Sequence, residues 1–274
     1  MAAPYPYQIQ RLSVPVLNWP VALDGLTVLH ISDIHLDHYL LPHVNAFVET
    51  FSALAPDLVC CTGDVVTIGN KHLTALEAMM AAIPAKLGRF ACLGNHDYDD
   101  HAHSQAVRAM WQAAGYRLLV NQSVQLNAEA PCYVAGVDDL KHGQPDLQAT
   151  FQQIPPDSAC ILLAHNPKNY PELARYQPSL ILCGHTHGGQ NQLFSPVCRL
   201  TFGPYYDGGL YTDHASPLYL NSGLGTATLP IGWGRWRYAL PVPRYKTQAE
   251  VALLSLSSTD SAKPNEQPTG LGIA

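Results

Sequence analysis

The sequence predicts an α/β protein built around parallel β-strands. Short apolar runs, each about as long as a buried strand, alternate with segments whose apolar residues recur at helical spacing. This strand–helix–strand order is typical of parallel βαβ units. The 274 residues can bury a substantial core without a break in composition, so we expect one domain over residues 1–256. Residues 257–274 are polar, and we expect a disordered tail there.

The predicted elements follow in order from these patterns. An alternating segment at 7–21 contains prolines, which confine it to one or two strands at a sheet edge. Further strands are predicted over 26–31, 57–62, 89–93, 118–120, 123–126, 132–137, 159–164, 180–183, 218–220 and 249–256. Helices are predicted over 42–54 and 73–83 and within 98–115, the last after the polar residues 99–103, with a short one over 147–154.

Composition excludes several classes of function. Hydrophobic residues make up 47% and charged residues 13% of the chain, and the net charge of −6 argues against general nucleic-acid binding. The seven cysteines form no CxxC pair, and five of them lie inside or at the edge of apolar runs. We therefore expect buried cysteines in a reducing compartment, and no thiolate zinc site.

The sequence offers little sign of a membrane segment. Residues 1–19 lack a basic stretch followed by an apolar core, and no uncharged apolar run approaches the ~18 residues that a membrane span requires. We expect a cytoplasmic protein, with peripheral membrane contact left open. A basic and aromatic cluster either packs under a loop, the interpretation slightly favoured, or lies at a membrane interface; it comprises Trp233, Arg235, Trp236 and Arg237.

Polar residues follow five of the predicted strands, at the point where each apolar run ends. They are Asp33 with His35, Asp64, Asn95 with His96, His165, and His185 with His187. Each of these strand endings, taken alone, could be a turn or a helix cap. Five such endings together favour a site, because parallel strands bring their carboxyl ends to one edge of a sheet. On extended backbone, Asp33 and His35 would project from one side of the strand.

Other polar segments are given more ordinary roles. His101 and His103 are expected to lie in a solvated loop, and Asp97 to act as a helix cap or a support for the neighbouring ligands. Asp138 and Asp139 favour a polar loop, with substrate contact as the lesser alternative. The segment 190–214, rich in glycine, proline and tyrosine, is expected to be a functional loop over the site.

The residue types in the strand-end set indicate a metal site. Carboxylate, amide and imidazole groups without thiolate suit manganese, iron or zinc, and manganese is our first expectation. The seven candidate ligands, which are this set without His96, are too many for one ion, and they fit two divalent ions that share Asp64. Two adjacent ions are a standard arrangement for in-line attack at phosphorus, in which a metal-bound hydroxide is the nucleophile.

The ordered motif set resembles that of the calcineurin-like metallophosphoesterase superfamily over roughly residues 26–256. The matching motifs are Asp33-x-His35, Gly63-Asp64, Gly94-Asn95-His96-Asp97, His165 and Gly184-His185-x-His187. This resemblance implies a four-layer α/β/β/α sandwich of two mixed sheets. It also implies one ion on Asp33, His35, Asp64 and His187, and a second on Asp64, Asn95, His165 and His185. His96 would then be the general acid or an electrostatic partner of the phosphoryl group.

Two further segments resemble the bacterial branch that contains YkuE- and YaeI-type phosphodiesterases. They are His187-Gly188-Gly189-Gln190 and Ser222-Gly223-Leu224-Gly225-Thr226 followed by Leu229-Pro230-Ile231. The resemblance implies a phosphohydrolase that acts on a phosphodiester or diphosphate, with a UDP-2,3-diacylglucosamine pyrophosphatase of lipid A synthesis as an alternative. Many members of this branch carry an amino-terminal membrane segment that this sequence does not show. A non-catalytic scaffold of the same fold is the alternative from another class.

Overall fold

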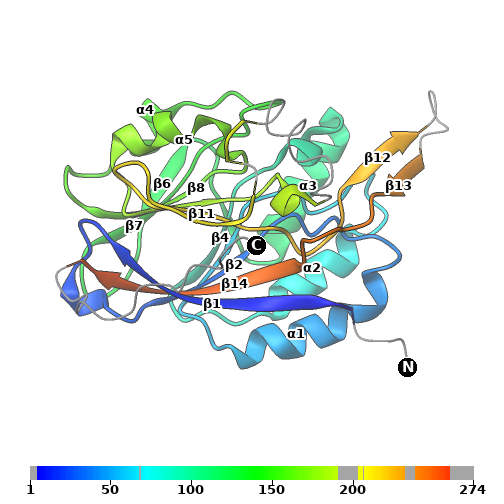
Figure 1. Ribbon diagram of the computed structural model, residues 1–274, viewed down its shortest axis with the longest axis horizontal. Coiled ribbons are helices and arrows are strands. Elements are labelled where there is room, and N and C mark those ends of the chain that lie inside the picture. The colour runs from blue at the N-terminus through cyan, green and yellow to red at the C-terminus, as the bar shows by residue number, and fades with distance from the viewer. Residues whose placement is uncertain (1–4, 68, 191–202, 206, 232–237, 260–274) are drawn as a thin grey trace, which may run out of the picture.

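The computed structural model describes residues 5–67, 69–190, 203–205, 207–231 and 238–259. Within these ranges the strands form two mixed six-stranded sheets and a separate two-stranded ribbon, with helices on both outer sides (Figure 1). The ribbon pairs β12 (Thr228–Ile231) with β13 (Tyr238–Pro241). The predicted α/β class with two mixed sheets is confirmed.

The first sheet has the strand order β1-β14-β2-β3-β4-β5. Its strands are β1 (Tyr7–Val16), β2 (Thr27–Ile31), β3 (Leu58–Cys61), β4 (Gly88–Ala91), β5 (Arg117–Leu118) and β14 (Ala249–Ser258). Strands β2 to β5 run parallel, whereas β14 is antiparallel to β2 and parallel to β1. The carboxyl ends of β2, β3 and β4 therefore meet at one edge.

The second sheet has the order β10-β11-β9-β8-β7-β6. Its strands are β6 (Gln122–Gln125), β7 (Cys132–Gly136), β8 (Ala159–Leu163), β9 (Leu180–Cys183), β10 (Gly209–Tyr211) and β11 (Leu218–Leu220). Strands β7, β8, β9 and β11 are parallel, and the edge strands β6 and β10 are antiparallel to their neighbours. This sheet supplies a second set of adjacent carboxyl ends.

Apolar side chains divide the molecule into four layers. The helices α1 (Val44–Ala53), α2 (Leu73–Ala82) and α3 (His101–Ala113) pack on the outer face of the first sheet. A second cluster fills the space between the sheets, and a third lies beneath α4 (Leu147–Phe151) and α5 (Tyr170–Leu173) on the second sheet. Successive residues of a strand point to opposite faces, so one strand serves two clusters: Val28 faces the other sheet and Leu29 faces the helices.

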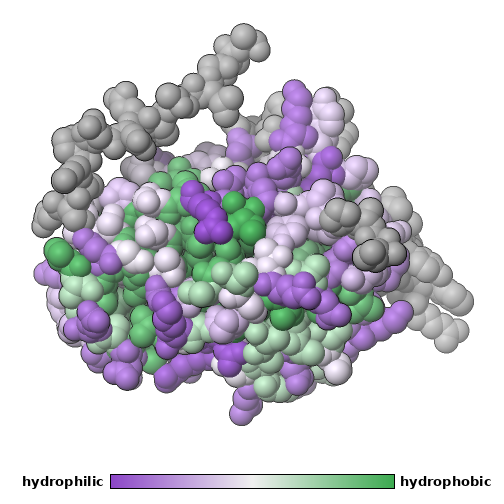
Figure 2. All heavy atoms as spheres, turned by 90° about the horizontal axis from the view of Figure 1, so that it is seen from below, coloured by the Kyte–Doolittle hydropathy of each residue, from purple (hydrophilic) through white to green (hydrophobic). Residues whose placement is uncertain are grey.

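The outer helix α1 shows why such a segment folds against the sheet. Phe47 and Phe51, one turn apart, are buried, while Glu49 between them is exposed. Burial of each phenylalanine contributes about 1.5–3 kcal/mol. The face of the molecule on this side mixes hydrophilic and hydrophobic residues (Figure 2).

Most predicted elements are present, with boundaries that differ by a few residues. The predicted helix over 42–54 is a 3₁₀ turn (Leu41–His43) followed by α1, and the edge-strand prediction for the amino-terminal segment is confirmed by β1. Strand β14 continues to Ser258, so residues 257 and 258, expected in a disordered tail, are part of a sheet. The elements β10, β12, β13 and α5 were not predicted, because each is short and lies in a segment without a clear period.

The structure also bears on the predictions for the cysteines and for a membrane segment. Six of the cysteines lie in the described ranges and are buried and unpaired there: Cys60, Cys61, Cys92, Cys132, Cys160 and Cys183. Among the described residues, no helix is both long and apolar enough to cross a membrane. The Trp233–Arg237 cluster and most of the expected loop over 190–214 lie outside the described residues.

Candidate metal centre

The two sheets bring the predicted polar strand ends into two neighbouring groups. Each group offers nitrogen and oxygen atoms that all lie within 4.8 Å of one another. The first group is Asp33, His35 and His187, and the second is Asp64, His165 and His185. All of these residues are buried except His185, which is partly buried. Residues from both sheets meet in each group, so neither sheet alone could form the centre.

The first group leaves a carboxylate oxygen without a hydrogen bond. Asp33 Oδ1 is buried and has no hydrogen-bond partner among the described residues, although His187 Nε2 lies 3.5 Å away. The other oxygen of Asp33 is held by the Ser32 hydroxyl at 2.5 Å and by the backbone N–H of His185 at 2.9 Å. One oxygen is thus fixed by the protein, while the other is directed into the centre.

The second group has the spacing of atoms that share an ion. His165 Nε2 lies 3.3 Å from Asp64 Oδ2, 3.3 Å from Asn95 Oδ1 and 3.1 Å from His185 Nδ1. Ligand atoms about 2.1 Å from a common ion in an octahedral shell lie ~3 Å from one another. His165 Nδ1 donates to the carbonyl oxygen of Thr62 at 2.7 Å, which leaves Nε2 for the centre. Both groups therefore fit a divalent ion.

The backbone at the centre adopts a conformation that non-glycine residues rarely use. Positive φ angles of 47°, 41° and 54° occur at Asp33, His35 and Asp64, and of 75° and 51° at His185 and His187. The expectation that Asp33 and His35 project from one side of an extended strand is therefore wrong. Strand β2 ends at Ile31, and the two residues reach the centre from left-handed turns. Such strain is typical of functional sites.

Two glycines allow the strand ends to approach closely. A Cβ on Gly184 would lie 1.9 Å from Ser32 Oγ and 2.2 Å from Asp33 Oδ2. A Cβ on Gly94 would lie 2.3 Å from Asp64 Oδ1 and 2.8 Å from His165 Cε1. These spaces are far too small for any side chain, so glycine at each position is required by the packing of the ligands.

A chain of buried hydrogen bonds runs to Asp33 from beneath the centre. His30 Nε2 lies 2.9 Å from Thr62 Oγ1, Thr62 donates to Ser32 Oγ at 2.7 Å, and Ser32 donates to Asp33. Since His30 Nδ1 is buried without a partner among the described residues, Nε2 carries the proton and donates. Sequence analysis did not single out His30, Ser32 or Thr62; hydroxyl and imidazole groups inside a predicted buried strand are the signal that could have found them.

Asp97 supports the second strand end. It is fully buried, and its carboxylate accepts hydrogen bonds from the backbone N–H groups of Asp64, Val65 and Gly94 at 2.8–3.2 Å. Its bond from the Gly94 N–H also caps the start of the 3₁₀ helix η3 (Asn95–Tyr98), for which Gly94 is the N-cap residue. Both parts of its expected role, cap and support, are present.

Burial and mutual charge shift the titration of these groups. Burial lowers the pKa of His35 and His185 to about 3, which keeps their imidazoles neutral and available as ligands. Burial opposes ionisation of Asp64 as well, but the charge of His165 holds the pKa of this carboxyl well below its usual range. Burial and the Asp64 charge raise the pKa of Asp97 to about 7.

Arg244 is a supporting residue that sequence analysis missed. Its guanidinium donates to the carbonyl oxygens of Ser222 and Gly223 at 2.9 and 3.0 Å and to that of His187 at 3.3 Å. A Cβ on Gly223 would lie 2.7 Å from Asp33 Cβ, so the loop that Arg244 holds packs directly against the centre. No local pattern marks this arginine, because its contacts depend on chain segments about 20 to 57 residues away.

Sequence analysis also assigned roles to His103, Asp138 and Asp139, which are not among the proposed ligands. His103 is 2% exposed within α3, with its Nδ1 2.7 Å from Asn70 Oδ1, so the expectation of a solvated loop is wrong. The helix begins earlier than expected because the Asp100 side chain caps it by accepting from the His103 N–H. Asp138 and Asp139 are buried after β7.

Comparison with known proteins agrees with this geometry. The model of the calcineurin-like phosphoesterase family matches residues 26–189. The uncharacterized metallophosphoesterase YkuE of Bacillus subtilis is 29% identical, covering 88% of this chain and 82% of its own length. The UDP-2,3-diacylglucosamine pyrophosphatase LpxG of Chlamydia trachomatis is 28% identical, covering 84% and 87% respectively. A solved structure, TT1561 of Thermus thermophilus, has a TM-score of 0.49 at 14% identity, covering 75% of this chain and 93% of that one. Because the family model spans more than half of the sequence, the chain belongs to the calcineurin-like metallophosphoesterases.

Proposed function

We propose that this protein is a phosphohydrolase that uses two divalent metal ions to cleave a phosphodiester or a diphosphate. The observation that carries the proposal is the position of Asp64 between the two groups. Its Oδ2 lies 3.7 Å from His35 Nε2 and 3.3 Å from His165 Nε2. In this proposal the first ion is held by Asp33, His35, Asp64 and His187, and the second by Asp64, Asn95, His165 and His185.

Two ions bound there would lower the pKa of a coordinated water and offset charge on the phosphoryl oxygens. The chain contributes the orientation of the ligands. Asp33 is held by Ser32 and the His185 N–H, and His165 by the Thr62 carbonyl, so the ligand atoms are in place before substrate binds. The buried walls exclude water from the ligands, which strengthens every charge interaction with a phosphoryl group.

His96 is the residue proposed to act on the leaving group. It is partly buried, as His185 is, whereas the other proposed ligands are buried, and its backbone N–H donates to Asp64 Oδ1 at 2.7 Å. Its Nδ1 lies 3.3 Å from the Thr67 carbonyl oxygen. With Nδ1–H directed to that carbonyl, Nε2 is the ring nitrogen left for the leaving group, and in the imidazolium form its N–H would donate the proton to the departing oxygen.

The similarity to LpxG supports a diphosphate as the second candidate substrate, and it favours UDP-2,3-diacylglucosamine among such compounds. Manganese is the proposed metal, with iron and zinc as alternatives, because the ligand set lacks thiolate. A non-catalytic scaffold predicts binding of two ions without turnover.

The direct test is hydrolysis of bis(p-nitrophenyl) phosphate by protein that has been stripped with a chelator and reloaded with manganese. We expect turnover that depends on the added metal. If no divalent ion restores turnover toward any of several phosphodiesters and diphosphates, the proposal is wrong; two bound ions without turnover would instead support the scaffold.

Two substitutions separate the proposed roles. Asp64→Ala should lose both metal ions, whereas His96→Ala should keep them and lose most of the activity. His101→Ala, which alters an exposed histidine of α3, is the matched control and should change neither quantity. Metal content is measured by elemental analysis of the purified variants; an empty centre in His96→Ala would contradict the assignment of His96.

A further inference from the structure

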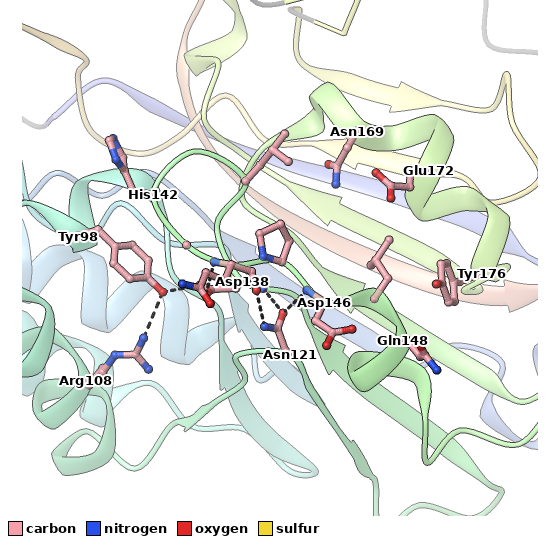
Figure 3. A pocket seen from close by; sticks show the side chains of 15 residues that line it. Tyr98, Arg108, Asn121, Asp138, His142, Asp146, Gln148, Asn169, Glu172 and Tyr176 are labelled. Atoms are coloured by element: carbon pink, nitrogen blue, oxygen red, sulfur yellow. Dashed lines mark hydrogen bonds between the residues drawn. The ribbon is translucent and has the colours of Figure 1, made fainter.

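A pocket of about 790 Å³, whose lining residues Figure 3 shows, is formed by chain segments that adjoin the second ligand group. Tyr98 lines it and belongs to η3, the same short helix that carries Asn95 and His96. Asp138 also lines it and follows β7, which pairs with β8, the strand that precedes His165. The pocket therefore lies where the part of a substrate beyond the reacting phosphoryl group would extend.

The wall nearest the centre is held together by its own hydrogen bonds. Asp138 accepts from the Tyr98 hydroxyl and from the Gln144 N–H, the latter at 2.9 Å. Asn121 accepts from the N–H groups of Asp138 and Asp146 at 3.0 Å and donates to the Gln144 carbonyl at 2.7 Å. These polar groups are occupied, so they give the pocket a fixed shape before a ligand arrives.

The far end of the pocket presents hydrogen-bond acceptors beside an aromatic ring. Asn169 Oδ1 is buried and has no hydrogen-bond partner among the described residues, so it requires a donor from a ligand or water. The Glu172 carboxylate lies at the same end (Figure 3). The Tyr176 ring is 42% exposed and is held by stacking on Phe151, with the ring centroids 4.8 Å apart.

These features suit a hydroxyl-bearing ring. Hydroxyl groups donate to carboxylate and amide oxygens, and the apolar face of a sugar ring packs against an aromatic ring. An ammonium group would also be attracted to a carboxylate, but choline or ethanolamine would fill only a small part of about 790 Å³. Arg108, which donates to the Tyr98 hydroxyl at 3.1 Å, adds a positive charge at the end nearer the centre, suited to a second phosphate.

We propose that this pocket binds the sugar or nucleoside portion of a phosphodiester or diphosphate substrate, with Asn169 and Glu172 accepting hydrogen bonds from its hydroxyl groups. The inference rests on the proposed function for the reaction and names the substrate class of the same site. It makes Asn169 and Glu172 specificity-determining residues that take no part in the chemical step.

The test compares three chromogenic substrates on the full-length, manganese-loaded protein. They are bis(p-nitrophenyl) phosphate, uridine 5′-(p-nitrophenyl phosphate) and p-nitrophenylphosphorylcholine. We expect Glu172→Ala and Asn169→Ala each to raise KM for the uridine ester about tenfold, because each removes an acceptor from a buried or charged hydrogen bond. The kinetic constants for the simple diester should stay within about twofold of wild type. Glu129→Ala, at an exposed position outside this pocket, is the matched control.

A binding measurement separates failure of the pocket from failure of the proposed reaction. Titration calorimetry with uridine 5′-monophosphate and glucose 1-phosphate should show about tenfold weaker binding to Glu172→Ala, whereas inorganic phosphate should bind equally to both proteins; the tighter of the two sugar ligands identifies the source. A selective loss in binding supports the pocket even if wild type hydrolyses nothing. Equal losses for all ligands, no loss, or a loss confined to the choline ester would overturn the proposal.

Discussion

Ser32→Ala should weaken metal binding at the first ligand group without unfolding the protein. Asp33 Oδ2 accepts two hydrogen bonds, from the Ser32 hydroxyl at 2.5 Å and from the His185 N–H at 2.9 Å. The substitution deletes the shorter of them and also removes the acceptor of the Thr62 hydroxyl. The carboxylate then keeps one of its two restraints and can rotate away from the centre.

The size of the effect follows from the charge of the acceptor. A hydrogen bond to a charged group contributes about 1.5–3 kcal/mol, which corresponds to a factor of roughly 10 to 150 in an equilibrium constant. Partners that orient metal ligands typically affect metal affinity by about 10- to 100-fold. We therefore expect the first ion to bind about 10- to 100-fold more weakly and the second ion to bind nearly as in wild type.

The assay is competition for manganese against a chromogenic chelator, which reports the two affinities of the apo-protein separately. Ser216→Ala is the matched control: Ser216 is equally buried, and its hydroxyl has no hydrogen-bond partner among the described residues. If Ser32→Ala binds both ions as tightly as this control, the hydrogen bond does not orient Asp33 and the reasoning is wrong.

Three further outcomes follow from the structure. His30→Gln keeps a hydrogen-bond donor but removes a buried imidazole whose pKa burial lowers to about 3. In the unfolded chain this histidine has an ordinary pKa near 6.5 and is protonated first as the pH falls. The wild-type stability therefore falls as the pH drops from about 6.5 toward 3. Urea unfolding of metal-free protein should show an acid-side slope that is shallower in the variant by up to about 1.4 kcal/mol per pH unit; an unchanged slope would exclude this role. Gly184→Ala should abolish binding of the first ion, because its Cβ would lie 1.9 Å from Ser32 Oγ and 2.2 Å from Asp33 Oδ2; full metal content by elemental analysis would contradict this. Asp97→Asn should lower the unfolding free energy by about 1–3 kcal/mol, because the amide has one acceptor oxygen where the carboxyl group has two, so at least one of three buried backbone N–H groups loses its partner; an unchanged denaturant midpoint would count against it.

The sequence was a good guide to the strands and to their polar ends. Buried parallel strands are nearly continuous apolar runs, so a polar residue after such a run marks the carboxyl end. The rule that these ends meet at one edge then brings Asp33, Asp64 and Asn95 together from the first sheet, and His165 and His185 from the second. This rule gathers the residues within each sheet, whereas the facing of the two sheets was expected only from the family resemblance.

Sequence patterns could not predict the backbone conformation at the centre or the residues that support the ligands. The left-handed conformation of Asp33 and His35 is set by hydrogen bonds to a neighbouring strand end: the N–H groups of both residues donate to the carbonyls of Gly63 and Asp64. Arg244 acts through carbonyl oxygens brought near it by the tertiary fold. Neither effect leaves a periodic or local signature, since both depend on contacts between distant parts of the chain.

The position of β14 bears on how this protein folds during synthesis. This strand comes near the carboxyl end of the chain, yet it lies between β1 and β2 and pairs with both (Figure 1). Until β14 has been synthesised through Ser258, β2 has an open edge and β1 has no partner in the sheet. Pairing across so long a separation is intrinsically slow and leaves strand edges exposed to aggregation. The backbone N–H of Glu250 on the same strand also donates to the carbonyl of Gly223, in the loop beside Asp33, so the centre is completed only in the last stage of folding.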